Sequence, residues 1–254
     1  MIDTHSHIYS NDFATDRAET ILRAKEAGVT HIILPNCDSG TLPQMLALEA
    51  DFPGYCHAAI GLHPTSVNEN FQNELAIVKS ELERRNWIAI GEIGIDLYWD
   101  KTFINEQRLA FQQQIEWALE YKLPVIIHVR DSFRETMNAI EPYKNSGLKG
   151  VFHSFTGSLE EAREIINFGG FFMGINGIVT FKNSGLSELL KDIDLLHIVL
   201  ETDSPYLTPA PYRGKRNESA NVSLVCQKLA GIYNFLPEQI DKQTTLNATS
   251  LFAI

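Results

Sequence analysis

The sequence predicts an α/β fold in which eight parallel strands alternate with helices and close into a TIM (β/α)8 barrel. The first observation is length, because 254 residues suit one such barrel, a single domain over residues 1–254. The second is the alternation of short apolar runs with amphipathic stretches along the whole chain. The third is that no glycine-rich phosphate loop follows the first strand, which disfavours a doubly wound open sheet.

Eight segments carry the strand pattern. Each is a nearly continuous apolar run rich in Val, Ile or Phe, which is typical of strands buried on both faces of a parallel sheet. The predicted strands are residues 2–7, 31–35, 57–62, 87–93, 124–129, 150–155, 170–175 and 197–201.

Helical patterns lie between these strands. Asp16 is predicted to cap a helix over residues 17–27, with Glu19 as its capping-box partner and Gly28 as the stop. Apolar residues at helical spacing predict three further helices, over residues 101–121, 160–168 and 222–231.

Composition limits the class of protein. Hydrophobic residues make up 44% of the chain, enough for a core, but no apolar run of about 18 residues predicts a membrane span. With no secretory signal and three cysteines without paired spacing, we expect a cytoplasmic protein without disulfides. The net charge of −11 argues against a protein that coats nucleic acid. It leaves open an enzyme that handles a nucleic-acid end through metal ions.

The histidines divide into two groups along the predicted strands. Active sites of such barrels form at the C-terminal ends of the strands. Five of the eight histidines fall at or just after such ends: His5, His7, His63, His128 and His153. The other three lie at strand starts and are predicted to be structural: His31, His57 and His197. Within the first strand, His5 and His7 would share one face.

Two carboxylates follow the same pattern. Glu92 ends the fourth predicted strand, and Asp203 lies just past the eighth. Imidazoles with a carboxylate on each side suit two divalent ions, with Glu92 as the bridge, and admit Mg²⁺, Mn²⁺, Zn²⁺ or Ni²⁺. The predicted metal ligands are therefore His5, His7, Glu92, His128, His153 and Asp203.

Two further residues, His63 and Glu201, each have more than one possible role. His63 is either a metal ligand from the third loop or a phosphate contact. Glu201 lies two residues before Asp203 and so faces the same way. It is favoured as a hydrogen-bond acceptor that orients a ligand, with direct ligation and a structural role inside the barrel as the alternatives.

Seven ordered segments resemble the TatD-type metal-dependent deoxyribonucleases of the amidohydrolase-like barrels. They are residues 3–7, 61–64, 91–96, 124–130, 152–158, 201–207 and 213–218, and residues 244–248 resemble the closing helix of the family. Two positions depart from the family pattern: Ser6 stands where Cys is frequent, and Ser219 where Pro is frequent.

The resemblance implies a TIM barrel that holds one to three divalent metals and cleaves DNA from the 3′ end. It implies that His5, His7, Glu92 and Asp203 bind a first metal, and that Glu92, His128 and His153 bind a second. Asp203 is the predicted acceptor of the proton from a metal-activated water, so Asp203 and Glu92 are the predicted catalytic pair.

Substrate contacts are predicted on the loops after the fifth, seventh and eighth strands. The cations there would hold backbone phosphates of a single-stranded DNA 3′ end: Arg130, Lys182, Arg213 and Arg216, beside Lys215. Tyr206 and Tyr212 are placed to stack a terminal base. We expect a monomer that makes no membrane contact.

Two other functions stay open at this stage. A metal pair attacks a carbonyl carbon as readily as phosphorus, so the alternative is a hydrolase of carboxylic esters or amides, such as aminoacyl-tRNA deacylation. The other is a non-catalytic metal-dependent scaffold, which predicts no open coordination position and no turnover.

Overall fold

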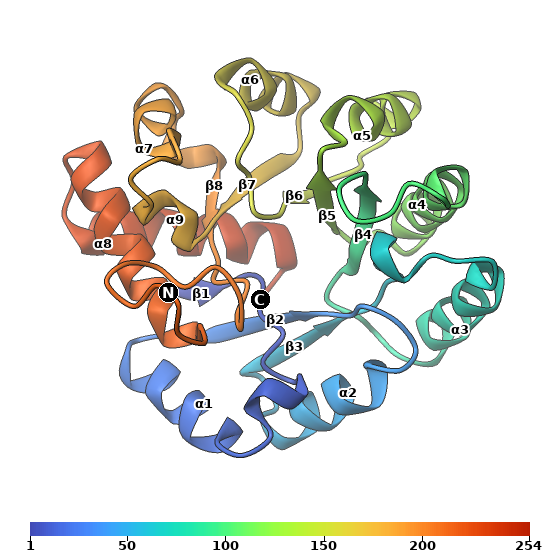
Figure 1. Cartoon of the computed structure of the whole chain (residues 1–254), viewed down its shortest axis with the longest axis horizontal. Helices are drawn as coiled ribbons and strands as arrows, with labels where there is room; N and C mark the ends of the chain where they lie inside the picture. The colour runs from blue at the N-terminus through green and yellow to red at the C-terminus, as the bar shows by residue number, and fades with distance from the viewer.

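The computed structural model describes residues 1–254 and shows the strands of the barrel surrounded by helices (Figure 1). All neighbouring strands pair in parallel. The strands are β1 (Ile2–Asp3), β2 (His31–Pro35), β3 (Cys56–Ala59), β4 (Ile90–Asp96), β5 (Val125–Arg130), β6 (Gly150–Phe152), β7 (Phe171–Ile175) and β8 (Ile198–Leu200).

The strands form two hydrogen-bonded groups that follow sequence order, β1 to β3 and β4 to β8. Short contacts join the groups on both sides. Ile60 bridges Ile90 at one seam. At the other, Ser6 bridges Ser204, and the Thr4 N–H donates to the carbonyl oxygen of Leu200 at 3.0 Å. The wall is therefore closed, and the predicted TIM-barrel fold is confirmed.

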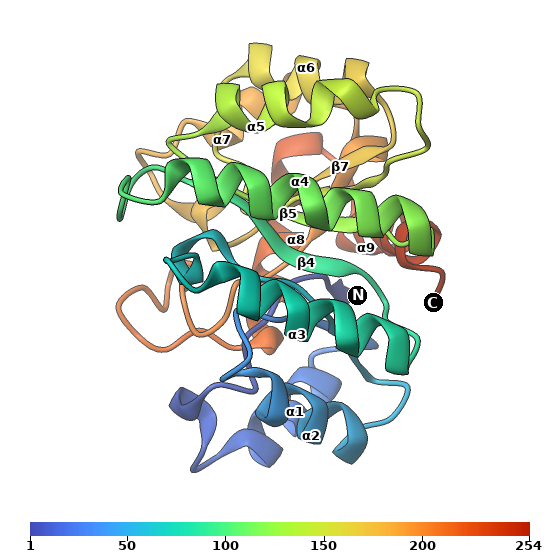
Figure 2. The same ribbon diagram turned by 90° about the vertical axis from the view of Figure 1, so that its right-hand side faces the viewer.

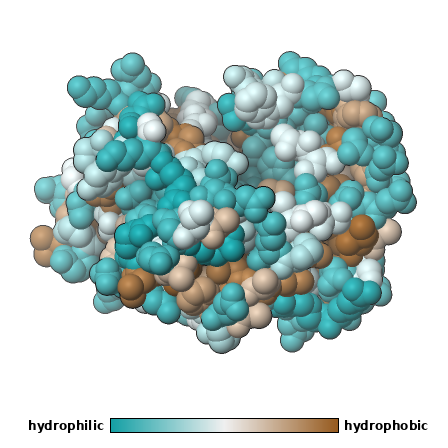
Figure 3. Space-filling model, turned by 60° about the horizontal axis from the view of Figure 1, so that its bottom comes forward, coloured by the Kyte–Doolittle hydropathy of each residue, from teal (hydrophilic) through white to brown (hydrophobic).

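Helices surround the strands, and the last of them passes behind the barrel in the view of Figure 1. They are α1 (Arg17–Glu26), α2 (Leu42–Asp51), α3 (Phe71–Arg84), α4 (Ile104–Tyr121), α5 (Phe133–Ile140), α6 (Leu159–Phe168), α7 (Leu186–Leu189), α8 (Val222–Tyr233) and α9 (Pro237–Phe252). None of them has both the length and the apolar character that crossing a bilayer requires. The face shown in Figure 3 is largely hydrophilic, with hydrophobic residues in separate patches.

The barrel interior is apolar at one end only. Ile32 and Leu34 of β2 pack outward in the large core beneath the helices. Ile33 between them instead belongs to a second apolar cluster with Ile126 of β5 and residues of α9 such as Phe252. This alternation is expected for a barrel strand. The loops after β4 and β8 project from the other end, away from both chain termini (Figure 2), so polar side chains gather there.

Several predicted boundaries shift. β1 ends at Asp3 rather than at residue 7, and the Asp3 carboxylate accepts hydrogen bonds from the N–H and hydroxyl of Thr202 at 2.9 and 2.7 Å. His5 and His7 therefore lie in irregular backbone just past the strand. In contrast, β4 continues to Asp96, three residues beyond its predicted end.

The predicted capping box at α1 is wrong. Asp16 does occupy the N-cap position, but its carboxylate makes no hydrogen bond to the backbone of the first turn. It instead accepts two hydrogen bonds from the Arg216 guanidinium and one from Arg23. A bidentate contact between two charged groups is stronger than the bond from a carboxylate to a backbone N–H, which favours the exchange of partners.

Candidate metal centre

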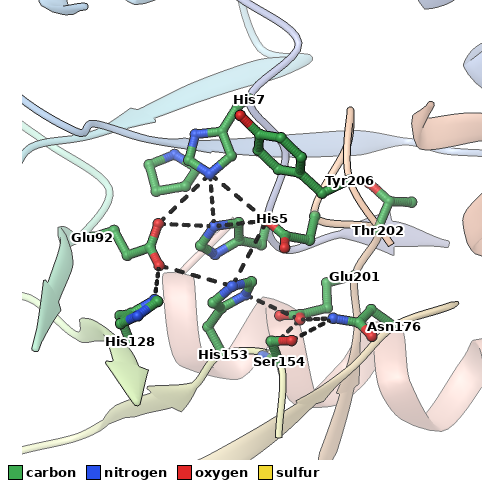
Figure 4. A network of polar contacts seen from close by, with 12 residues as sticks. His5, His7, Glu92, His128, His153, Ser154, Asn176, Glu201, Thr202 and Tyr206 are labelled. Carbon is green, nitrogen blue, oxygen red and sulfur yellow. Dashed lines mark hydrogen bonds and ion pairs between the residues drawn. The ribbon is translucent and has the colours of Figure 1, made fainter. Parts of the chain in front are cut away.

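Polar side chains from six strand ends converge at the open end of the barrel (Figure 4). Every predicted metal ligand is among them, and His63 from the loop after β3 joins them. Three overlapping groups have ligand atoms within 4.8 Å of one another: His5 with Glu92 and His153, His5 with His7 and Asp203, and His63 with Glu92 and His128. The site is built from imidazole nitrogens and carboxylate oxygens, which is a donor set for divalent ions.

Glu92 lies at the middle of this cluster, and its two oxygens face different histidines. Oε2 is 3.2 Å from Nε2 of His5 and 3.6 Å from Nε2 of His7. Oε1 is 3.0 Å from Nδ1 of His128 and 3.4 Å from Nε2 of His63. A carboxylate placed between two sets of nitrogens offers one oxygen to each set.

Asp203 covers the cluster from the β8 side. Its Oδ1 is 3.7 Å from Nε2 of each of His5, His7 and His153. Its backbone has a φ of 57°, a left-handed conformation that few non-glycine residues adopt. The Asp203 N–H donates to the carbonyl oxygen of His5 at 2.9 Å, which fixes this turn beside the imidazoles.

Burial and charge set the protonation of the first two histidines. Burial lowers the pKa of His7 to about 4 and that of His5 well below its ordinary value. Both imidazoles are therefore neutral at pH 7, the form that offers a lone pair to a cation. Burial acts against the charge of Glu92, but His63, His5 and His153 together hold the pKa of Glu92 well below its ordinary value.

The same cluster has a strong affinity for positive charge. Burial lowers the pKa of His153, but the carboxylates of Glu201, Asp203 and Glu92 outweigh it and raise that pKa to about 10. Burial raises the pKa of Asp203 to about 7. Burial of Asp203 and the carboxylates around His153 therefore both favour a bound positive charge, which metal ions supply without a proton.

The Glu201 carboxylate faces His153 on the side away from the other ligands. Its Oε1 lies 3.0 Å from Nδ1 of His153 and accepts hydrogen bonds from the Ser154 N–H and the Asn176 side chain at 2.8 and 3.2 Å (Figure 4). A Cβ at Gly174 would lie 2.1 Å from Oε2 of Glu201, so β7 needs glycine here. The Nε2 of His153 is left to face the other ligands, which supports the orienting role among the three alternatives for Glu201.

Asp96 orients His128 through a hydrogen bond, and it is not among the site residues predicted from the sequence. Its Oδ2 is 2.8 Å from Nε2 of His128, so Nδ1 of that ring faces Glu92. A signal was present, because alternate residues of a strand share one face. Asp96 is four residues after Glu92 in β4 and therefore points into the same space.

Tyr9 was also missed, and it fixes the tautomer of His7. The Tyr9 hydroxyl donates its single proton to the carbonyl oxygen of Pro35 at 2.6 Å. It must then accept from the Nδ1–H of His7, 2.9 Å away. This arrangement leaves the Nε2 lone pair of His7 directed at Glu92 and Asp203.

A Tyr9→Phe substitution is expected to weaken metal binding about tenfold or more, because partners that orient a ligating histidine contribute 10- to 100-fold in general. Competition with a chromogenic chelator measures the affinity. Tyr206→Phe is the matched control, since the ring of Tyr206 lies 6.4 Å from that of His7 but its hydroxyl makes no hydrogen bond. An unchanged affinity in the Tyr9 variant would show that the hydroxyl does not position His7.

The predicted basic rim is heterogeneous. Arg130 stacks on Tyr98 at 4.1 Å, and Arg213 on Phe181 at 3.8 Å, and neither makes an ion pair. Lys182 is exposed and unpaired. Arg216 differs, because its guanidinium is bound by the Asp16 carboxylate at 2.8 and 2.6 Å. A phosphate would have to displace this carboxylate, so Arg216 is a weaker candidate for substrate binding than the other three.

Arg216→Gln is expected to destabilise the fold in a pH-dependent way. The hydrogen bond from Arg216 is the largest cause that lowers the pKa of Asp16 from 3.8 to about 2. Because the folded-state pKa is depressed, the stabilisation is complete above about pH 4 and is lost as pH falls through about 2. Thermal unfolding should show a deficit at pH 7 that narrows below pH 4. Lys191→Gln, which breaks an exposed pair with Glu188, is the control. A deficit independent of pH would contradict this account.

Comparison with known proteins places this centre in a family. Residues 2–253 match the family described as TatD related DNase. The chain is 36% identical to the uncharacterized metal-dependent hydrolase YabD of Bacillus subtilis, covering 100% of this chain and 99% of YabD. It is 32% identical to the 3′-5′ ssDNA/RNA exonuclease TatD of Erwinia billingiae, with the same coverage. The crystal structure of YJJV, a TatD homologue from Escherichia coli, superposes with a TM-score of 0.93 at 29% identity, covering 100% of this chain and 98% of that one. The chain is therefore a member of the TatD-related DNase family of metal-dependent hydrolases.

Proposed function

We propose that this chain is a metal-dependent exonuclease that removes nucleotides from the 3′ end of single-stranded DNA, with two divalent ions at its centre. The observation that carries the proposal is the placement of Glu92, whose two oxygens face two separate sets of imidazoles. The similarity to the Erwinia relative, a 3′-5′ ssDNA/RNA exonuclease, supports the substrate class. When bound, such ions supply Lewis acidity and a water of lowered pKa.

The position of each residue determines whether we propose it as a metal ligand or as a proton acceptor. His5, His7, Glu92 and Asp203 would hold one ion, and Glu92, His128 and His153 the other. Asp203 is the proposed proton acceptor, because its side chain is 14% exposed whereas that of Glu92 is 3% exposed. A proton taken up by Asp203 can therefore pass to solvent, while Glu92 stays fixed as the bridge.

The substrate is held outside this centre. Arg130, Lys182 and Arg213 are unpaired cations on the same mouth and would contact backbone phosphates. They provide local positive charge on a protein whose net charge is −11. All of the proposed ligands come from one chain, so we propose that a monomer is the active unit.

The test is a cleavage assay on protein stripped of metal and reloaded with Mg²⁺, Mn²⁺, Zn²⁺ or Ni²⁺ in turn. A 5′-labelled single-stranded oligonucleotide should shorten stepwise from its 3′ end, and a phosphorothioate at the last linkage should slow the first step. Metal analysis should find two ions per chain. Release of product from an aminoacyl ester without cleavage of DNA would favour the ester or amide alternative. No turnover with any ion and any of these substrates would favour the scaffold.

A further inference from the structure

The loop after β4 exposes a large aromatic side chain beside the centre. The chain has three tryptophans. Trp87 and Trp117 are 5% and 8% exposed, whereas Trp99 is 67% exposed. Its neighbour Tyr98 is 53% exposed. Leaving this much aromatic surface in water forgoes the free energy that burial would supply, and adjacent exposed aromatic residues are typical of a binding surface.

These rings are organised together with a cation. The ring centroids of Tyr98 and Trp99 are 4.9 Å apart, and the rings stand nearly perpendicular, at 88°. The Arg130 guanidinium carbon lies 4.1 Å from the Tyr98 centroid and 5.4 Å from that of Trp99. Arg130 makes no ion pair, so its charge is available to a ligand. We call Tyr98, Trp99 and Arg130 the aromatic ledge.

The aromatic ledge is tied to the metal centre through a single carboxylate. Asp96 Oδ1 accepts hydrogen bonds from the N–H groups of Tyr98 and Trp99, at 2.9 and 3.0 Å. The other oxygen of Asp96 holds His128. A ligand on the ledge would therefore lie on a segment whose backbone is fixed relative to the centre.

We propose that the aromatic ledge is a nucleobase subsite, in which a base of a single-stranded nucleic acid stacks on Trp99 and a nearby phosphate pairs with Arg130. The inference rests on the proposed function and identifies where that substrate would be bound. An indole face accepts every base, and a guanidinium matches phosphate oxygens, so this pair of groups suits a strand of any sequence. Tyr206, in the loop after β8, lies on another part of the mouth, because β8 is not adjacent to β4 or β5.

Binding is measured without cleavage, by fluorescence anisotropy of a labelled phosphorothioate oligothymidylate in the presence of Mn²⁺. An abasic phosphorothioate chain of the same length and charge is the second probe. Trp99→Ala should weaken binding of the thymidylate on the order of tenfold and leave the abasic chain unaffected. Trp99→Phe should restore most of the loss. In the wild type, the thymidylate should shield tryptophan fluorescence from acrylamide, because Trp99 is the exposed indole.

The role of Arg130 is tested with the same two probes. Arg130→Gln should weaken both probes and reduce the salt dependence of binding by about one phosphate contact. Arg84→Gln, at the end of α3, is the matched control and should change neither.

The outcomes separate the subsite from the nuclease activity. Equal affinity of wild type and Trp99→Ala for the thymidylate would overturn the subsite even if the enzyme cleaves DNA. Base-dependent binding at Trp99 without any cleavage would uphold the subsite and overturn the proposed nuclease. Self-association that Trp99→Ala abolishes, with no base-dependent binding, would overturn the subsite in favour of a dimer contact.

Discussion

Glu92→Gln is expected to lower kcat/KM for a single-stranded oligonucleotide by about 10³-fold, since a bound divalent ion stabilises developing charge by several kcal/mol. Glutamine has the shape of glutamate but is neutral, and one of its two polar atoms is an NH₂ group. That group must face either His5 and His7 or His128 and His63, because the two carboxylate oxygens face these two sets. One set of imidazoles then meets a donor in place of an anion.

Metal content separates this effect from a general loss of activity. The variant should retain fewer than two ions per chain, and added metal should raise its Tm less than that of the wild type. Glu83→Gln removes an exposed carboxylate from α3 and should change neither quantity. Two ions bound at wild-type affinity, with turnover intact, would show that Glu92 is not the bridge.

The barrel and the cluster at its mouth could be predicted because both follow from local patterns. Parallel strands are apolar runs, and residues at their C-terminal ends meet at one mouth wherever the barrel closes. The opposite end follows the same rule. His31 is the first residue of β2 and His57 the second of β3, and their ring nitrogens lie 3.0 Å apart in the structure.

The partners of these residues could not be predicted in the same way, because they are distant in sequence. Asp16 pairs with Arg216, 200 residues away, instead of capping α1. The two departures from the family pattern are themselves in contact, since the Ser219 hydroxyl donates to the Ser6 hydroxyl at 3.3 Å. Each serine is unremarkable when considered alone. Only the closure of the barrel reveals that they form one buried polar group with Ser204.

Asp203→Asn is expected to lower kcat by 10²- to 10⁴-fold, the usual contribution of a positioned proton acceptor, while metal content largely survives. Asparagine keeps an oxygen for the ion but cannot take the proton from the attacking water. It also suits the backbone, because Asn adopts left-handed conformations such as the φ of 57° at this position more readily than most residues. A loss of turnover should therefore not arise from misfolding.

The measurements are metal analysis, Tm and kcat at saturating oligonucleotide, with Asp51→Asn at the end of α2 as the matched control. Paired with Glu92→Gln, the Asp203 variant distinguishes two ways of failing. Loss of an ion together with turnover is the signature of a metal ligand, whereas loss of turnover alone is the signature of a proton acceptor. Full turnover in Asp203→Asn would remove Asp203 from the proton transfer. Loss of metal in that variant would make its ligand role the dominant one, because His5, His7 and Glu92 would then be insufficient to retain the ion.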